Sequence, residues 1–199
     1  MSPPDPATTR QDEILDRTFE LLSESGLAGL TMKKVAERVG FTEPAIYRHF
    51  PNKQALLLGV AGRLGGMLLG PVREIAARQD LPPLERIELI VAHHIGVIVD
   101  TEGIPILLLA ESMASAEPEL SSKMAGFAGA YLQIVGELAQ ELPSPPDAPP
   151  MSVRVLPVLG VAAAVALQRR FLATQKMSRD EAIALARYVV RRVLGEGEV

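Results

Sequence analysis

The stretch TMKKVAERVGFTEPAIYRHFPNKQALL, residues 31–57, carries most of the information about this fold. It consists of two short amphipathic segments separated by Gly40, a residue that suits the positive φ of a tight turn. Two helices joined so closely need a small residue where they pack, and Ala36 occupies that position. With Ile46 as an apolar anchor in the second segment, these residues have the spacing of a helix-turn-helix.

The other face of this stretch is polar. Thr31 and Thr42 precede the two segments, where N-cap residues stand. Hydroxyl groups at helix N-termini, together with amino and phenol groups, bind phosphate. The further polar residues of this face are Lys33, Lys34, Arg38, Tyr47, Arg48, His49 and Lys53. The small and apolar frame alone is equally consistent with a structural helical hairpin that has a solvated face.

The segment IYRHFPNKQALL at the end of the stretch favours a helix-turn-helix that binds DNA over a structural hairpin. It resembles the signature of the tetracycline-repressor (TetR) family of transcriptional regulators. The residues that carry the pattern are Thr31, Ala36, Gly40, Thr42, Tyr47, His49, Phe50, Lys53 and Leu56. The resemblance covers about residues 10–60. It implies a three-helix DNA-binding head, a variable helical ligand-binding body and a homodimer.

The resemblance also assigns roles, with residues 42–50 as the recognition helix in the major groove of double-stranded DNA. It implies phosphate contacts from Thr31, Lys33, Thr42, Tyr47, His49 and Lys53, and base-edge contacts from Glu43, Pro44, Ala45 and Arg48. Glu43 could accept a hydrogen bond from a cytosine amino group. It is equally a residue type found as a solvated charge at helix N-termini, and we favour this second interpretation.

Composition predicts an all-α chain, and the resemblance implies its division into a head and a body. The chain has 199 residues, many aliphatic side chains, no Cys and no Trp. Its net charge of −4 means that nucleic-acid binding has to come from a local patch. We expect a disordered N-terminus (1–9), a helix-turn-helix domain (10–55) and a ligand-binding and dimerisation domain (56–199), with about nine helices in all.

Residues that interrupt helices, chiefly glycine and proline, determine the limits of the predicted helices. The predicted helices are 10–25, 32–39, 42–50, 53–79, 84–100, 104–115, 118–141, 151–174 and 179–194. Gly26 is expected to end the first helix at positive φ, and Pro71 to kink the fourth. Ser178 and Glu181 form a capping-box pattern. Residues 142–150, LPSPPDAPP, are the clearest linker.

The body contains a candidate effector site. Small residues on apolar helices leave room between them, and Met adapts to irregular ligands. The candidate lining residues are Met67, His94, Ile98, Leu108, Glu111, Met113, Phe127 and Tyr131. Taken singly, each is more typical of ordinary core packing, but the resemblance implies a pocket for a small, largely apolar effector.

Enzymatic and metal sites are not indicated. His93 and His94 are adjacent, so on a helix their side chains point in different directions and cannot easily share one ion. The chain has no HExxH, GxSxG or GxxxxGK motif. We therefore expect no catalytic residues, no metal and no cofactor. The alternative to a DNA-binding regulator is a protein-interaction module whose degenerate helix-turn-helix no longer binds DNA.

The last two long helices are the expected dimer seam. Residues 153–167 are too apolar for an exposed face, and the last helix keeps an apolar side that includes Val190. Two such helices from each subunit could form a four-helix bundle, whereas burial within one subunit is the alternative. The longest uncharged run, residues 155–168, is shorter than the ~20 residues of a membrane span.

Together these features predict a cytoplasmic, ligand-responsive DNA-binding transcriptional regulator without a membrane span. Repression is the favoured mode, with a homodimer on a palindromic operator that a small apolar effector releases. The sequence names neither the effector nor the operator.

Overall fold

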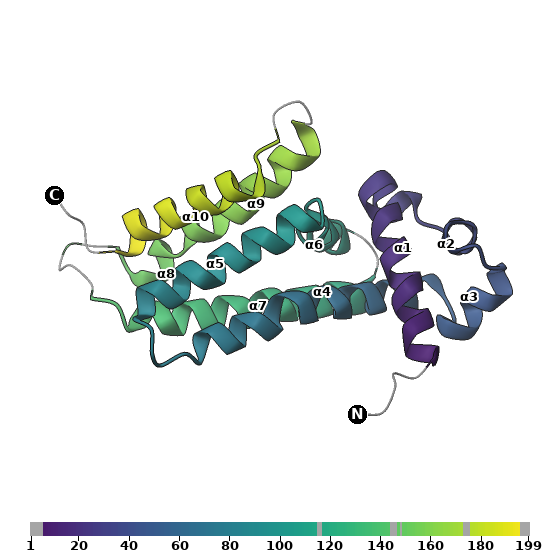
Figure 1. Cartoon of the computed structure of the whole chain (residues 1–199), viewed down its shortest axis with the longest axis horizontal. Helices are drawn as coiled ribbons and strands as arrows, with labels where there is room; N and C mark the ends of the chain where they lie inside the picture. The colour runs from purple at the N-terminus through teal and green to yellow at the C-terminus, as the bar shows by residue number, and fades with distance from the viewer. Residues whose placement is uncertain (1–5, 115–116, 144–146, 148, 173–175, 196–199) are drawn as a thin grey trace.

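The computed structural model describes residues 6–114, 117–143, 147, 149–172 and 176–195. These residues form ten helices and no strand, so the predicted all-α class is confirmed. Figure 1 shows two parts along the long axis. The three N-terminal helices, which we call the head, lie at one end, and the fourth helix runs from the head into an elongated bundle, which we call the body.

The head contains α1 (Pro6–Gly29), α2 (Met32–Val39) and α3 (Glu43–His49). The Thr31 side chain accepts a hydrogen bond from the Lys34 backbone N–H at 3.2 Å, so the predicted N-cap of α2 is confirmed. Gly40 ends α2 with φ 79°, as the turn requires. Ala36 and Ile46 are buried where the two helices meet.

Helix α1 begins at Pro6, earlier than the predicted residue 10, while residues 1–5 lie outside the described part of the chain. The predicted positive φ at Gly26 is confirmed: φ is 65° and ψ is −173°. Only glycine adopts this region readily, because a Cβ would clash with the backbone. The break interrupts the helical hydrogen bonds, and a short helical turn then carries the chain to Gly29.

The body is built around one buried helix. Its helices are α4 (Lys53–Ala76), α5 (Pro83–Asp100), α6 (Ile104–Ala114), α7 (Pro118–Gln140), α8 (Met151–Arg154), α9 (Leu156–Phe171) and α10 (Arg179–Leu194). Helix α5 packs against α4, α7, α9 and α10. It is buried on nearly all sides, from Arg86 to Val99, which explains its continuous apolar run.

Helix α4 continues through Pro71. Proline has no N–H, so it leaves the Met67 carbonyl, four residues earlier, without its usual helical donor. The His93 Nε2 atom of α5 lies 2.9 Å from that carbonyl oxygen. Because a carbonyl can only accept, His93 donates here and joins α5 to α4 at the gap in the helical hydrogen bonds.

Other predicted boundaries need correction. The fourth helix ends at Ala76 rather than at residue 79, and the predicted helix 151–174 is divided at Val155 into α8 and α9. The capping box of Ser178 and Glu181 is confirmed in both directions, at 2.8 and 3.2 Å. Part of the predicted linker, residues 144–146 and 148, lies outside the described residues.

Two stretches, Lys53–Ala76 and Met151–Arg169, are long and apolar enough to cross a membrane by length and composition alone. Core helices of helical bundles pass the same test. Each of these stretches packs in the body, with 44% and 39% of the relevant window buried. They are therefore weak evidence for a membrane span.

Candidate nucleic-acid interface and ligand cavity

Helix α3 lies at the end of the molecule opposite the body (Figure 1), and its exposed residues include the polar Tyr47 and Arg48. Ile46 and Phe50 are buried and fix the helix against the head. Thr42 stands at its N-cap position, but its side chain makes no capping bond. Thr42, Tyr47 and Arg48 are exposed, and no described residue forms a hydrogen bond or ion pair with their side chains. Hydroxyl and guanidinium groups in this state are available to an external ligand.

The remaining predicted positions of α3 surround these residues. Pro44 is exposed, and Glu43, Ala45 and His49 are half-buried. Glu43 lies in the first turn of α3, where a carboxylate is favourable next to the helix dipole. The structure therefore brings Thr42, Glu43, Pro44, Ala45, Tyr47, Arg48 and His49 together on one short helix.

The cations of the head are not equally available. Arg38 is held by Glu24 at 2.7 Å and by Glu20 at 3.4 Å, and the Lys34 ammonium donates to the Gly29 carbonyl at 2.8 Å. Lys33 lies only at the limit of an ion pair, 4.0 Å from Glu37, and is exposed. Positive charge open to a partner is therefore concentrated on Arg48 and Lys33.

Lys53 and Thr31, both expected at phosphate, also have partners within the chain, and only the one of Lys53 was not predicted. The Lys53 ammonium donates to the Leu27 carbonyl at 3.0 Å, and the Thr31 hydroxyl caps α2. The N–H of the same Leu27 donates to the Glu111 carboxylate of α6 at 2.8 Å. The break at Gly26 is thus closed by one side chain from α4 and one from α6. Glu111 consequently lies at the junction of head and body, not in a body cavity.

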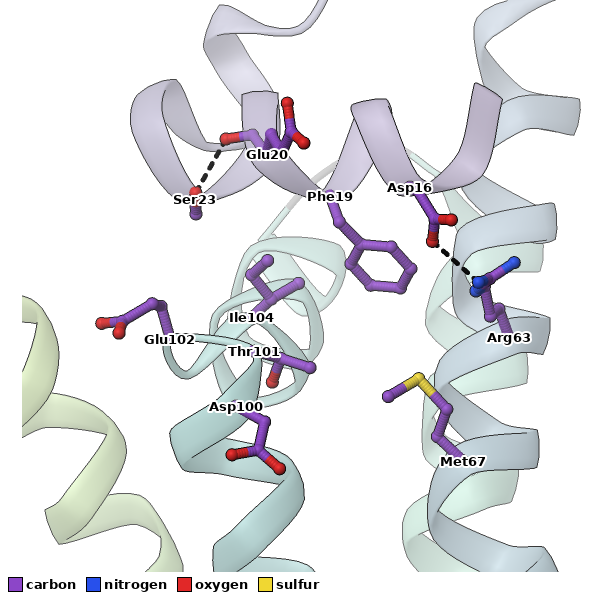
Figure 2. Close-up of a pocket in the computed structure, with 10 residues that line it drawn as sticks. All are labelled: Asp16, Phe19, Glu20, Ser23, Arg63, Met67, Asp100, Thr101, Glu102 and Ile104. Carbon is purple, nitrogen blue, oxygen red and sulfur yellow. Dashed lines mark hydrogen bonds and ion pairs between the residues drawn. The ribbon is translucent and has the colours of Figure 1, made fainter. Parts of the chain in front are cut away.

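A cleft of about 290 Å³ separates α1 from the body (Figure 2). Phe19 and Ile104 point into it from opposite sides, and the predicted residue Met67 lines its wall. Its acidic side chains are already neutralised. Asp16 pairs with Arg63 at 2.7 Å, and Glu20, Asp100 and Glu102 each have a basic partner elsewhere. The cleft therefore marks the head–body junction rather than a binding site for a cation.

A second cavity, of about 210 Å³, lies inside the body between α4, α5, α6, α7 and α9. Three predicted residues line it together: His94, Phe127 and Tyr131. The rings of His94 and Tyr131 meet edge to face, with centroids 4.7 Å apart. Burial, and to a lesser extent the charge of His93, lowers the pKa of His94 to about 4, so this imidazole is neutral near pH 7. Burial alone raises the pKa of the Tyr131 hydroxyl.

The other predicted lining residues lie elsewhere. Ile98 and Leu108 are buried in the two apolar cores, and Met113 is 72% exposed on α6. Helical periodicity could not separate these sides, because α6 carries apolar residues on its solvent side as well, and Met113 is one of them. The cavity residues that sequence reasoning missed are Leu68, Pro105, Ile106, Leu109, Met124, Ala128, Leu132, Leu159 and Ala162.

The last two helices leave an apolar surface. Leu156, Leu167 and Leu185 of α9 and α10 are exposed. In contrast, Val190, which we had placed in the expected seam, is 0% exposed and packs in the core of its own subunit. Its assignment to the seam is wrong, because apolar side chains of α10 face α5 as well as solvent.

Comparison with known proteins identifies the head. Residues 14–60 match the sequence profile of the bacterial regulatory proteins of the tetR family. The chain is 40% identical over 55 residues to the class D tetracycline repressor protein of Escherichia coli, an alignment that covers 28% of this chain and 25% of that repressor. The head therefore belongs to the TetR family. The matched part of the repressor is thus a quarter of its length, and it coincides with the helix-turn-helix.

The whole fold also agrees with TetR-family structures. A TetR-like transcriptional regulator from Rhodococcus sp. RHA1 superposes with a TM-score of 0.76 at 16% identity, covering 98% of this chain and 100% of that one. The transcriptional regulator FadR of Bacillus subtilis, in complex with stearoyl-CoA, superposes with a TM-score of 0.73 at 18% identity. That alignment covers 94% of this chain and 99% of FadR. At these identities the likeness concerns the fold, including the body.

Proposed function

We propose that this TetR-family protein is a cytoplasmic, DNA-binding transcriptional regulator that acts as a homodimer, most readily as a repressor. The observation that carries the proposal is the exposed polar set of α3, in which Thr42, Tyr47 and Arg48 have no partner among the described residues. A structural hairpin has no need for such groups. Their placement on an exposed short helix suits phosphate and base contacts in a major groove.

The dimer follows from the requirements of DNA and from the apolar surface of α9 and α10. One seven-residue helix offers few contacts, and two recognition helices about 34–36 Å apart can enter successive major grooves. Leu156, Leu167 and Leu185 would be covered by the same helices of a second subunit. An operator with two related half-sites is the corresponding DNA partner.

Effector control is the second part of the proposal. The body cavity would hold a small, largely apolar molecule, and the neighbour FadR carries stearoyl-CoA in a similar fold. Phe127 of the cavity lies against Gly65 of α4 so closely that a Cβ there would come within 2.5 Å of its ring. A ligand that moves Phe127 would therefore press on α4, whose first residues support the head. It can change DNA affinity only if it favours one head arrangement over another.

The test is binding to the DNA that flanks the protein's own gene, measured by fluorescence anisotropy at several salt concentrations. We expect specific binding that weakens steeply with salt, because each phosphate contact releases counterions. A scrambled fragment of equal length is the control. Equal affinity for both fragments, or no dependence on salt, would instead favour a protein-interaction module.

A further inference from the structure

The chemistry of the body cavity restricts what it can bind. Of the described residues, twelve line it, and apart from the thioether of Met124 only His94 and Tyr131 among them contribute polar side-chain atoms. No Lys, Arg, Asp or Glu of the described part of the chain reaches its wall. A charged ligand would therefore lose its hydration without gaining an ion pair, which is strongly unfavourable.

The two polar groups of the wall lack partners. His94 is 9% exposed and Tyr131 is 4% exposed. Neither the imidazole nor the hydroxyl forms a hydrogen bond with any residue in the described ranges. Their polar atoms are not among the side-chain atoms that are shut off without a partner, so they open into the cavity, where a bound group can complete their hydrogen bonds. Their rings are in edge-to-face contact, which places both within reach of one small group.

We propose that this cavity binds a compact, uncharged and largely apolar molecule through one oxygen-bearing group, a carbonyl or a hydroxyl, that bonds to the Tyr131 hydroxyl and the His94 imidazole. The inference rests on the proposed effector control and defines the chemical class of the effector. The Tyr131 hydroxyl donates to the ligand oxygen. The neutral imidazole donates to a carbonyl through its N–H, or accepts from a hydroxyl through its other nitrogen.

The volume of the cavity limits the size of the ligand. The cavity of about 210 Å³ exceeds the ~150 Å³ that accommodates benzene, and it lies below the ~300 Å³ at which common ligand pockets begin. A molecule of roughly ten non-hydrogen atoms fits these limits. A long acyl chain, such as the one bound to FadR, would need a wider space than the described cavity offers.

Three probes of equal non-hydrogen atom count test the proposal by equilibrium dialysis without DNA. Acetophenone carries a carbonyl, cumene replaces its oxygen with a methyl group, and benzoate is a charged counterpart. We expect acetophenone to bind about tenfold more tightly than cumene, and benzoate at least ~100-fold more weakly than acetophenone. Tyr131→Phe should remove most of the preference for acetophenone over cumene while leaving cumene unchanged. Tyr188→Phe, the same change at an exposed position, is the matched control.

The alternative outcomes are distinct. Equal binding of cumene and acetophenone by the parent protein, or tighter binding of benzoate, would overturn the proposed chemistry. Absence of binding by all three probes would overturn the assignment of the cavity as a ligand site. If acetophenone binds through Tyr131 but leaves affinity for the flanking DNA unchanged, the cavity chemistry stands and the proposed effector control fails. Loss of specific DNA binding alone would contradict the proposed function and not this inference.

Discussion

The head and the body use their polar side chains in opposite ways. In the body, charged groups pair across helices: buried Arg86 of α5 binds Glu141 at 2.8 Å and the Ala76 carbonyl at 3.0 Å. On the outer face of the head, Thr42 and Arg48 have no partner in the part of the chain that the structure describes. Paired groups hold helices in place, whereas unpaired groups remain available for recognition. By this criterion the candidates for recognition within the body cavity are His94 and Tyr131.

The largest effect is expected when a charge replaces an apolar residue of the body, with different results at an exposed and at a buried position. Leu167→Arg alters a side chain that is 54% exposed on the proposed seam, while Val190→Arg puts a charge into the core. We expect Leu167→Arg to give folded monomers that no longer bind DNA at concentrations where the parent does. Val190→Arg should unfold the subunit, because an unpaired buried charge costs several kcal/mol.

Sedimentation velocity and thermal melting by circular dichroism separate these outcomes. Alanine at position 167 is the control, since it shortens the side chain without adding charge. A Leu167→Arg protein that still sediments as a dimer would move the seam away from α9.

A smaller effect, on operator affinity, is expected from replacing two arginines of the head, one without a partner and one paired with carboxylates. Arg48→Ala removes an unpaired cation from each α3, whereas Arg38→Ala removes one already bound by Glu20 and Glu24. With about 1–3 kcal/mol lost per contact, Arg48→Ala should weaken operator binding by roughly 5- to 150-fold per head, and Arg38→Ala by much less. If Arg48 contacts phosphate, its removal should also lower the slope of log affinity against log salt concentration by about one per head. Similar losses in both variants, measured by anisotropy, would remove the distinction between paired and unpaired cations.

Local signals in the sequence were sufficient for several turns and helix caps in both the head and the body. The Thr31 cap, the left-handed Gly40 and the Ser178–Glu181 capping box depend on residues within a few positions of one another, and all were predicted correctly. Lys53 was expected at phosphate, yet its ammonium lies on the Leu27 carbonyl. That contact arises only because Gly26 interrupts α1 and exposes a peptide group, a consequence of tertiary structure.

The body was harder because its helices are apolar on more than one side. His94, Phe127 and Tyr131 do share a cavity, but Ile98 packs in the core and Met113 faces solvent. The spacing of apolar residues identifies a buried side without stating which neighbour covers it. For the same reason the sequence could not distinguish Val190, covered within its subunit, from Leu185, which is exposed.

A substitution at the head–body junction should have a smaller effect, on the free energy of unfolding. Glu111→Ala removes the acceptor of the Leu27 N–H, which would then lack a partner at the break in α1. We expect a loss of about 1–3 kcal/mol in the free energy of unfolding, and faster hydrogen exchange at the Leu27 amide. Glu117→Ala is the matched control, because the Glu117 side chain lines the same junction and forms no hydrogen bond with another described residue. Unchanged exchange at Leu27 in the Glu111 variant would show that the carboxylate does not support the break.

The smallest expected effect concerns two adjacent histidines: His94 has no hydrogen-bond partner among the described residues, whereas His93 donates to the Met67 carbonyl. Met67 needs that donor because Pro71 lacks an N–H. We expect His93→Leu to lower the free energy of unfolding in urea by about 1 kcal/mol. Pro71→Ala supplies a backbone N–H that can close the helical bond, so His93→Leu should cost less in that background. The double-mutant cycle should give a coupling energy of about 0.5–1 kcal/mol, while any effect of Pro71→Ala on helix propensity cancels. A coupling energy of zero would mean that the hydrogen bond from His93 does not compensate for the helical donor that Pro71 lacks. Another contact would then hold α5 to α4.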